Sequence, residues 1–502
     1  MSSPPPPAPS SQPQAGAPAN SSEALRARYG ERYRWLLLMT VMMGTVASVM
    51  SSTVVNVAIP GLSHHFGLGQ DRAQWVTSGF MVAMTVSMLT TPWLLARFGY
   101  RATYAGCMWL LMAGGLGGGF AQDFPLVLAA RVAEGLAAGV VQPIPAIIIM
   151  RAFQPQEQGR AIGLFTMGVV LAPALGPSIG GVLVDWFGWR SIFFMVVPFC
   201  IASLWLGRRF VPATAPGGAV ASRSEALDWA GLALGTAGTL SLLDGLVSLR
   251  AGPPIRAAGL LALAGICFGI FLWWQARRTR LGQASLMNLR LFAWRPFAMG
   301  SLVTAIYGTA LFGSTYLLPV YMQMGLGLSA SSVGMVLLPS GLVLAGAIAI
   351  VSRLADRLPA NVLVSTGLAI LTLSFALMVT LGPSASLWML IAYSAIGRIG
   401  LGFILPSLNL GSMRGLEKDL ISQASSVINF IRMLGGAAGV SLCAIALEWR
   451  LASHGASLAG GTNLPARLAA FNEVFLMLAA LCALAMLAAR YLGSHSRLQN
   501  NP

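Results

Sequence analysis

Two side chains capable of proton chemistry, Arg131 and Glu134, lie three residues apart inside a long apolar stretch. This spacing places both on one face of an α-helix. Burial and a neighbouring guanidinium act in opposite directions on the proton affinity of a carboxylate, so Glu134 could bind and release a proton while Arg131 sets the balance. A static ion pair is the alternative, but burying a pair for stability alone brings little net gain. We therefore favour proton coupling through Glu134 and Arg131.

Three other polar residues, Asn56, Arg398 and Arg432, also interrupt apolar stretches and are candidates for lining a substrate cavity. Ionisable side chains at membrane depth usually face a cavity and have a function there. Arg432 could contact an anionic or polar group of a substrate, or join helices through backbone carbonyls. For Arg398 we favour the structural interpretation. Asn56 could supply a polar contact to substrate, although bonding between helices explains it equally well.

Two short turns of similar sequence carry a second set of charges, LLARFGYR at 94–101 and LADRLP at 354–359. Their similarity indicates an internal duplication, the construction of many secondary transporters. The candidate gate residues in these turns are Arg97, Gly99, Arg101, Asp356 and Arg357. They could close the cytoplasmic end of a transport path, or they could only fix the membrane orientation of the chain.

The elements that position these residues are membrane spans. The chain has 502 residues, of which 56% are hydrophobic and 9% are charged, against about 25% charged in soluble proteins. Apolar runs of about 20 residues indicate transmembrane helices. Fourteen such runs are predicted, at 34–60, 74–96, 101–121, 125–150, 159–184, 190–210, 228–249, 257–276, 296–323, 331–352, 360–381, 386–412, 422–447 and 469–492.

The net charge of +16 follows membrane topology rather than nucleic-acid binding. If the N-terminus is cytoplasmic, the inner loops and tails hold 22 of the 31 Lys and Arg residues and the outer loops hold six. This asymmetry is the positive-inside pattern. It predicts a multi-pass protein of the inner (plasma) membrane with both termini in the cytoplasm.

The predicted spans divide into two similar halves of six helices with two helices inserted between them. We expect an all-α integral membrane protein with seven segments. They are a disordered cytoplasmic tail (1–33), an N-terminal half (34–210), a cytoplasmic linker (211–227), two inserted helices (228–276), a cytoplasmic loop (277–295), a C-terminal half (296–492) and a second tail (493–502).

The fifth predicted span contains an unusual cluster of helix-bending and small residues: Pro173, Gly176, Pro177, Gly180 and Gly181. Proline removes a backbone donor and kinks a helix, whereas glycine allows close approach of a neighbouring helix in the membrane. A bent helix with a small face suits an interface that must seal and reopen during transport.

Several short motifs in this order resemble those of the fourteen-helix drug:proton antiporter family of the major facilitator superfamily, the EmrB/QacA-like branch. They are TVVNVAIP at 53–60, RVAEG at 131–135, GPSIGG at 176–181, LPVYMQ at 318–323 and NFIRMLGG at 429–436. The resemblance implies a major facilitator fold with fourteen transmembrane helices and the antiporter motif in the fifth. It also implies proton-driven export of small amphipathic or hydrophobic compounds, such as drugs, by alternating access.

The resemblance leaves other functions open. A dedicated exporter of one endogenous metabolite, siderophore or lipid, not necessarily coupled to protons, is the alternative. Relatives in two-membrane bacteria can work with a periplasmic adaptor and an outer-membrane channel, which are therefore possible partners. An enzyme is not expected, because the sequence lacks zinc-protease, nucleophile-elbow and phosphate-loop motifs. No cofactor, metal ion or nucleic-acid partner is expected either.

The chain departs from the family pattern at four positions. Ser51 occupies the position of the acid in span one, and Glu134 that of the glutamine in span four. The first loop motif has Ala96 in place of an aspartate and Pro92 in place of a glycine. The first pair predicts that the proton site has been relocated. Three membrane arginines against one central glutamate also favour neutral, weakly acidic or zwitterionic substrates over permanent cations.

Overall fold

The computed structural model describes residues 22–68, 70–73, 75–213, 226–251, 253–383, 385–456 and 464–493, and every regular element in these ranges is a helix. The helices of the first part are α1 (Ser22–Tyr29), α2 (Arg32–Phe66), α3 (Gln70–Ala73), α4 (Trp75–Ser87), η1 (Met88–Thr90), α5 (Thr91–Gly119), α6 (Phe124–Val141), α7 (Ile144–Ala152), α8 (Gln158–Phe187), α9 (Ser191–Phe194) and α10 (Val196–Phe210). Those of the second part are α11 (Trp229–Ala251), α12 (Pro254–Arg280), η2 (Leu289–Ala293), α13 (Arg295–Val320), η3 (Tyr321–Gly325), α14 (Ala330–Leu354), α15 (Ala360–Val379), α16 (Leu387–Met413), η4 (Lys418–Leu420), α17 (Ile421–Ser453), α18 (Leu464–Ala489) and η5 (Arg490–Gly493).

Short polar side chains mark where several helices begin. The Asp123 carboxylate accepts a hydrogen bond from Leu126 N (2.8 Å) at the start of α6. Ser386 accepts one from Met389 N (3.3 Å) at the start of α16. Such caps satisfy backbone donors that have no partner inside the helix. They fix the ends of helices whose apolar length is already set by the sequence.

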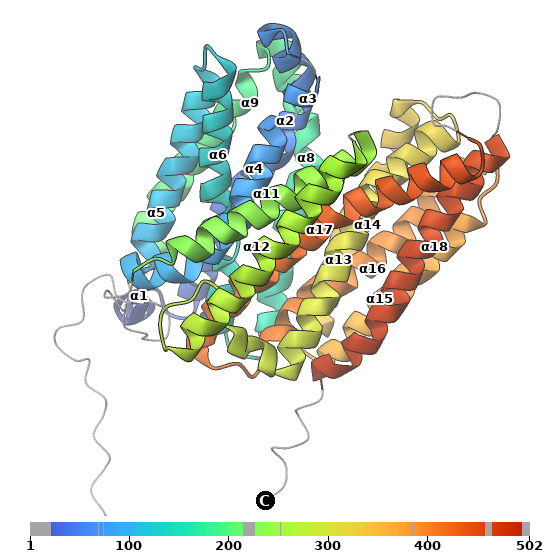
Figure 1. Cartoon of the computed structure of the whole chain (residues 1–502). Coiled ribbons are helices and arrows are strands. Elements are labelled where there is room, and N and C mark those ends of the chain that lie inside the picture. The colour runs from blue at the N-terminus through green and yellow to red at the C-terminus, as the bar shows by residue number, and fades with distance from the viewer. Residues whose placement is uncertain are drawn as a thin grey trace, which may run out of the picture.

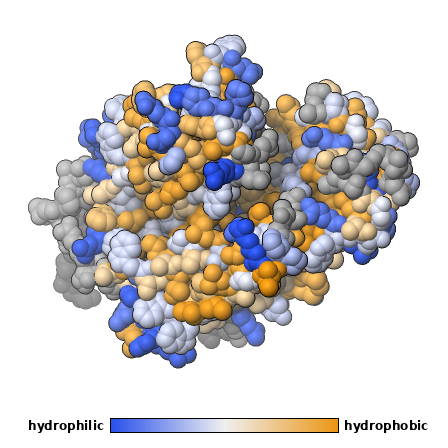
Figure 2. Space-filling model, turned by 45° about the horizontal axis from the view of Figure 1, so that its top comes forward, coloured by the Kyte–Doolittle hydropathy of each residue, from blue (hydrophilic) through white to orange (hydrophobic). Residues whose placement is uncertain are grey.

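The helices form two halves that meet at one end and diverge at the other (Figure 1). The first half contains α2–α10 and the second α13–α18. Contacts between them include those of α8 with α14 and α16, and those of α4, η1, α5 and α7 with α17. The inserted helices α11 and α12 pack against each other, and α11 also contacts α4 and α17. Apolar side chains cover much of the surface visible in Figure 2, where a hollow separates the two halves.

Twelve helical stretches of the described residues are long and apolar enough to cross a membrane. The prediction of an all-helical, multi-pass membrane protein is confirmed, but the predicted count of fourteen spans is not. The runs predicted at 74–96 and 101–121 form a single stretch, Trp75–Gly119, of 45 residues. In α8, a helix of 30 residues, the described apolar part covers only Gln158–Ala172.

The ends of the chain differ from the predicted boundaries. Residues 1–21 and 494–502 lie outside the described residues, as do 214–225 of the predicted linker. The predicted tail extends to residue 33, yet Ser22–Tyr29 forms α1 and α2 begins at Arg32. Tyr33 anchors this region, because its hydroxyl donates to Phe210 O (3.0 Å) at the end of α10.

A single glycine interrupts the stretch Trp75–Gly119. Gly99 has φ +78° and ψ 173° inside α5, a left-handed φ that a residue with a Cβ rarely adopts. A Cβ there would also lie 2.4 Å from Ala213 O. The turn at 94–101 therefore depends on glycine at this position both for its backbone angle and for its contact with the segment after α10.

Candidate transport site

Arg131 and Glu134 lie in α6, about 10 and 15 Å from its first residue at 1.5 Å per residue. As their spacing predicts, they form an ion pair through Arg131 Nη1 and Glu134 Oε2. Their side chains are only 2% and 1% exposed. Two full charges removed from water to this extent require further polar partners.

Ser51 of α2 supplies most of these partners. Arg131 Nη1 donates to Ser51 Oγ (2.8 Å) and Nη2 to Ser51 O (3.2 Å). Ser51 Oγ in turn donates to Glu134 Oε2 (3.1 Å). Nε of Arg131 donates to Val76 O of α4 (3.4 Å), and its guanidinium lies 4.3 Å from the centroid of the Phe80 ring. The cluster therefore joins three helices of the first half.

Close packing by α5 completes the burial of Glu134. A Cβ on Gly114 would lie 2.5 Å from Glu134 Cγ, so only glycine permits this approach. The second carboxylate oxygen, Oε1, has no hydrogen-bond donor among the described residues. Glu134 thus holds one oxygen in a network and leaves the other available for a proton.

The two departures from the family pattern in spans one and four meet at this site. Ser51 and Glu134 are 83 residues apart in sequence, and their side chains are hydrogen-bonded. A carboxylate on either residue would therefore lie beside the same guanidinium, that of Arg131. Sequence reasoning placed Glu134 and Arg131 together but missed the contact with Ser51, which only the packing of α2 on α6 creates.

Arg432 of α17 lies at the seam between the halves. It donates to Asn429 Oδ1 (2.7 Å) of its own helix and to Gln142 Oε1 (3.2 Å) at the end of α6. Two turns earlier in α17, Ser425 Oγ donates to Pro143 O (3.1 Å). Sequence reasoning missed Gln142, which ends a helix rather than interrupting one. The guanidinium of Arg432 has neutral amide partners and no carboxylate in the described part of the chain.

The other two cavity candidates lie apart from this seam. Arg398 of α16 is partly buried and, within the described residues, has no hydrogen bond or ion pair. Tyr307 of α13, which sequence reasoning also missed, lies within electrostatic reach of both Arg398 and Arg432. Asn56 of α2 is exposed, and its Oδ1 accepts a hydrogen bond from Thr77 Oγ1 (3.0 Å). The structure does not bring Asn56 together with the two arginines.

Of the candidate gate residues, Asp356 in the second half makes hydrogen bonds to the first half. Its carboxylate accepts from the backbone N–H groups of Gly159 (2.7 Å) and Arg160 (3.2 Å), in the first turn of α8. A carboxylate at a helix N-terminus satisfies free donors and complements the helix dipole. Burial raises the pKa of Asp356 above its usual range, although these two N–H groups oppose the shift.

The remaining gate candidates lie in or beside the same two turns. Nε of Arg101 donates to Val211 O (2.8 Å), which belongs to the same half. Arg97 and Arg357 are exposed. Gly99 provides the turn described above. Other bonds across the seam come from two arginines outside the prediction, Arg151 to Lys418 O (2.8 Å) and Arg414 to Pro155 O (3.4 Å).

Removing the Asp356 contact should weaken the closed end of the molecule. We expect Asp356→Ala to destabilise the closed state by about 0.5–2 kcal/mol, as for other lost caps, and so to lower the ratio of closed to open molecules about 2- to 30-fold. Distances between one spin label at the last residue of α7 and another at the first residue of α15 would measure the change. Asp356→Asn, which keeps one acceptor oxygen, should have a smaller effect. An unchanged distance distribution in Asp356→Ala would show that the contact does not hold the halves together.

The glycine motif of α8 packs against α2. A Cβ on Gly176 would lie 2.5 Å from Thr53 Oγ1, and one on Gly180 would lie 2.9 Å from Val54 Cγ1. Gly181 has open space around the same position. α8 is one helix from Gln158 to Phe187, whereas the side chains of the predicted Pro173 and Pro177 lie outside the described residues.

The protein has two helical halves around a hollow, polar contacts between the halves at one end, and a buried ion pair inside one half. These features define a multi-pass membrane transporter. Residues 41–440 match the model of the Major Facilitator Superfamily, and the chain belongs to this family. The prediction that it is a transporter of small molecules and not an enzyme is therefore confirmed.

Relatives with drug-resistance names occur among similar proteins. The chain is 26% identical over 448 residues to the MFS-type transporter YcnB of Bacillus subtilis, covering 89% of this chain and 92% of the relative. It is 28% identical over 443 residues to Multidrug resistance protein B homolog of Mycobacterium tuberculosis, covering 86% and 80%. The human organic anion transporter MFSD10 shares the fold, with a TM-score of 0.66 at 16% identity over 91% of this chain and 99% of that one.

Proposed function

We propose that this protein exports small amphipathic or hydrophobic compounds in exchange for protons. The observation that carries the proposal is the buried cluster of Arg131, Glu134 and Ser51. Ionisable groups at membrane depth are costly and are usually retained for function. The similarity to Multidrug resistance protein B homolog supports drug-like substrates.

In the proposed cycle the two halves rock about the hollow between them. The described conformation is closed at the end where Asp356 contacts α8, and Arg432 contacts Gln142 further along the seam. Protonation of Glu134 weakens its pairing with Arg131 and frees α2 and α6 to shift. Opening of the closed end then requires these contacts across the seam to break, and substrate enters as they do.

We propose fourteen spans in the inner membrane, with both termini cytoplasmic. A helix of 45 residues would be about 67 Å long, whereas a bilayer core is about 30 Å thick. The stretch Trp75–Gly119 must therefore cross twice, turning at Gly99. The 30 residues of α8 are also sufficient for one crossing. With fourteen spans, the chain would belong to the EmrB/QacA-like branch that its motifs resemble. The adaptor and outer-membrane channel implied by that branch stay a prediction.

The charges of the second half favour particular substrates. Arg398 and Arg432 have no carboxylate partner in the described ranges, so a permanently cationic compound would meet uncompensated positive charge. We expect weakly acidic and neutral amphiphiles to be exported several-fold faster than matched quaternary ammonium compounds. Arg432→Gln should reduce the preference for the acids. A clear preference of the wild type for cations would contradict this.

Proton flux in proteoliposomes tests the exchange itself. A pH-sensitive dye sealed inside vesicles containing the purified protein would report proton movement when each compound is added. Antiport predicts proton movement that depends on substrate and collapses when an ionophore removes the gradient. Substrate movement without proton movement would refute proton coupling and leave a facilitator or an exporter driven by another ion.

A further inference from the structure

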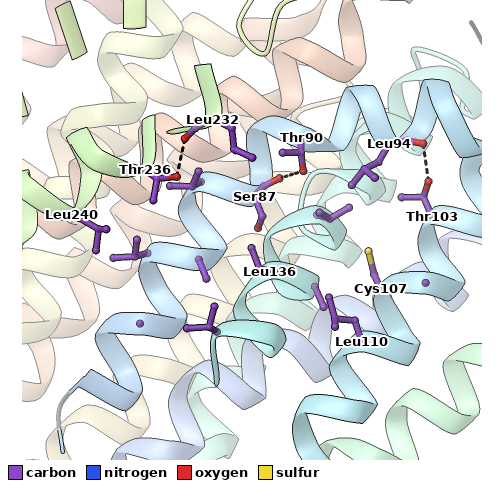
Figure 3. Close-up of a pocket in the computed structure, with 18 of the residues that line it drawn as sticks. Ser87, Thr90, Leu94, Thr103, Cys107, Leu110, Leu136, Leu232, Thr236 and Leu240 are labelled. Atoms are coloured by element: carbon purple, nitrogen blue, oxygen red, sulfur yellow. Dashed lines mark hydrogen bonds between the residues drawn. The ribbon is translucent and has the colours of Figure 1, made fainter. Parts of the chain in front are cut away.

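A long apolar groove of about 730 Å³ lies between the first half and the inserted helix α11. Figure 3 shows Leu232, Thr236 and Leu240 of α11 on one side, with residues of α4, α5 and α6 opposite. None of the residues that form the Arg131 cluster lines the groove. It is therefore separate from the proposed proton site and independent of the proposed function.

The groove follows the direction in which α4 crosses the membrane. Residues of α4 and η1 line it at every third or fourth position from Trp75 to Thr90, a distance of about 22 Å at 1.5 Å per residue. A bilayer core is about 30 Å thick, so one leaflet contributes about 15 Å. The groove is long enough to hold the acyl chain of a lipid from either leaflet.

Its walls are almost entirely apolar. No lining residue is charged. The hydroxyl groups of Thr90, Thr103 and Thr236 donate to the carbonyls of Ser87 (2.7 Å), Leu94 (2.9 Å) and Leu232 (2.7 Å), respectively. Since burying a polar group without a partner is unfavourable, the occupant must be apolar along its length. This argues against an amphipathic substrate.

The groove is also open towards the lipid. Phe98, Leu136 and Leu110 line it and are 56%, 42% and 39% exposed. A void with apolar walls stays dry, and empty space forfeits dispersion contacts. We infer that an acyl chain of a membrane phospholipid fills this groove and forms part of the contact between α11 and the first half. The acyl chain leaves one apolar environment, the bilayer, for another, the groove. Its binding therefore depends on how well its shape fits the groove and not on the hydrophobic effect.

Two glycines provide a matched pair of variants to test this. Gly106 of α5 lines the groove and Gly265 of α12 does not; both are exposed, and a Cβ on either would have no atom within 4 Å. Full-length protein in nanodiscs would be irradiated with phosphatidylcholine that carries a diazirine in one acyl chain, and the adducts mapped by mass spectrometry. We expect adducts on α5 and α11 groove residues to exceed those on exposed Leu263 and Ile266 of α12.

Gly106→Trp should reduce the groove adducts severalfold, whereas Gly265→Trp should leave them unchanged. If Gly106→Trp does not fold, Leu240→Trp fills the groove from α11 and should have the same effect. Equal labelling of the groove and of α12, or groove labelling unaffected by the filling variant, would overturn the inference. So would loss of the adducts on adding an exported compound, because the groove would then be a substrate path.

Discussion

Glu134→Gln is expected to reduce substrate-dependent proton movement to the level of empty vesicles. Glutamine is nearly the same size as glutamate and can keep one oxygen towards Arg131 and Ser51, but it cannot take up a proton. Breaking a buried ion pair costs about 3–5 kcal/mol when the remaining charge is left unsatisfied. Here Arg131 keeps Ser51 Oγ, Ser51 O and Val76 O as acceptors, so we expect the variant to fold. Proton flux and size-exclusion profiles of the two proteins would establish both points.

A double variant separates loss of the proton site from nonspecific damage. Because Ser51 and Glu134 are in direct contact, Ser51→Asp combined with Glu134→Gln moves the carboxylate across to α2 and keeps it beside Arg131. We expect this double variant to recover part of the proton flux, whereas Ser51→Ala with Glu134→Gln should not. Unchanged export by Glu134→Gln alone, at normal expression, would refute the assignment.

Gly163→Val is expected to abolish export by preventing closure at the end where the halves meet. A Cβ on Gly163 of α8 would lie 1.4 Å from Oγ and 2.1 Å from Cβ of Ser352 on α14. Rotating the serine hydroxyl relieves the first clash but not the second, so the two helices must separate. Transport by alternating access requires both ends to close in turn. We therefore expect a protein that folds and binds substrate but does not turn over.

Gly346→Val is the matched control, because Gly346 of α14 is exposed and a Cβ there meets no atom within 4 Å. Both changes replace a helical glycine by the same β-branched residue. Transport assays with spin-label distances between α8 and α14 would compare them. Export by Gly163→Val equal to that of Gly346→Val would mean that the close approach of these helices is not required for transport.

Features that depend on local spacing could be predicted from the sequence, whereas contacts between distant helices could not. The pairing of Arg131 with Glu134 follows from three residues of separation along a helix. Their contact with Ser51 depends on how α2 packs against α6, which periodicity does not encode. Hydropathy likewise located the apolar stretches and the break between the runs 74–96 and 101–121, which falls at the non-helical Gly99. It could not show that helical structure continues on both sides of this glycine as one stretch of 45 residues.

The gate shows a second reason why sequence reasoning stops short. Asp356 was a candidate because it is a charged residue in a repeated turn. Its partners are the backbone N–H groups of Gly159 and Arg160, and backbone groups have no sequence signature. The groove beside α11 could not be predicted either. It is formed by faces of four helices, and each face is apolar as expected for any surface that contacts lipid, so the sequence does not mark these faces as a groove.

The use of backbone partners also bears on how this closure can change during evolution. Asp356, Arg151, Arg414 and Ser425 all bond across the seam to main-chain atoms. The residue that supplies such an atom can be replaced without losing the bond, provided that the local fold is kept. Gly159 is the exception, because a Cβ there would clash with the Asp356 carboxylate that it binds. Substitution scanning should therefore find tolerance at Lys418 and at Arg160, and intolerance at the side chains that reach them. Related sequences could diverge on one side of the seam without compensating changes on the other.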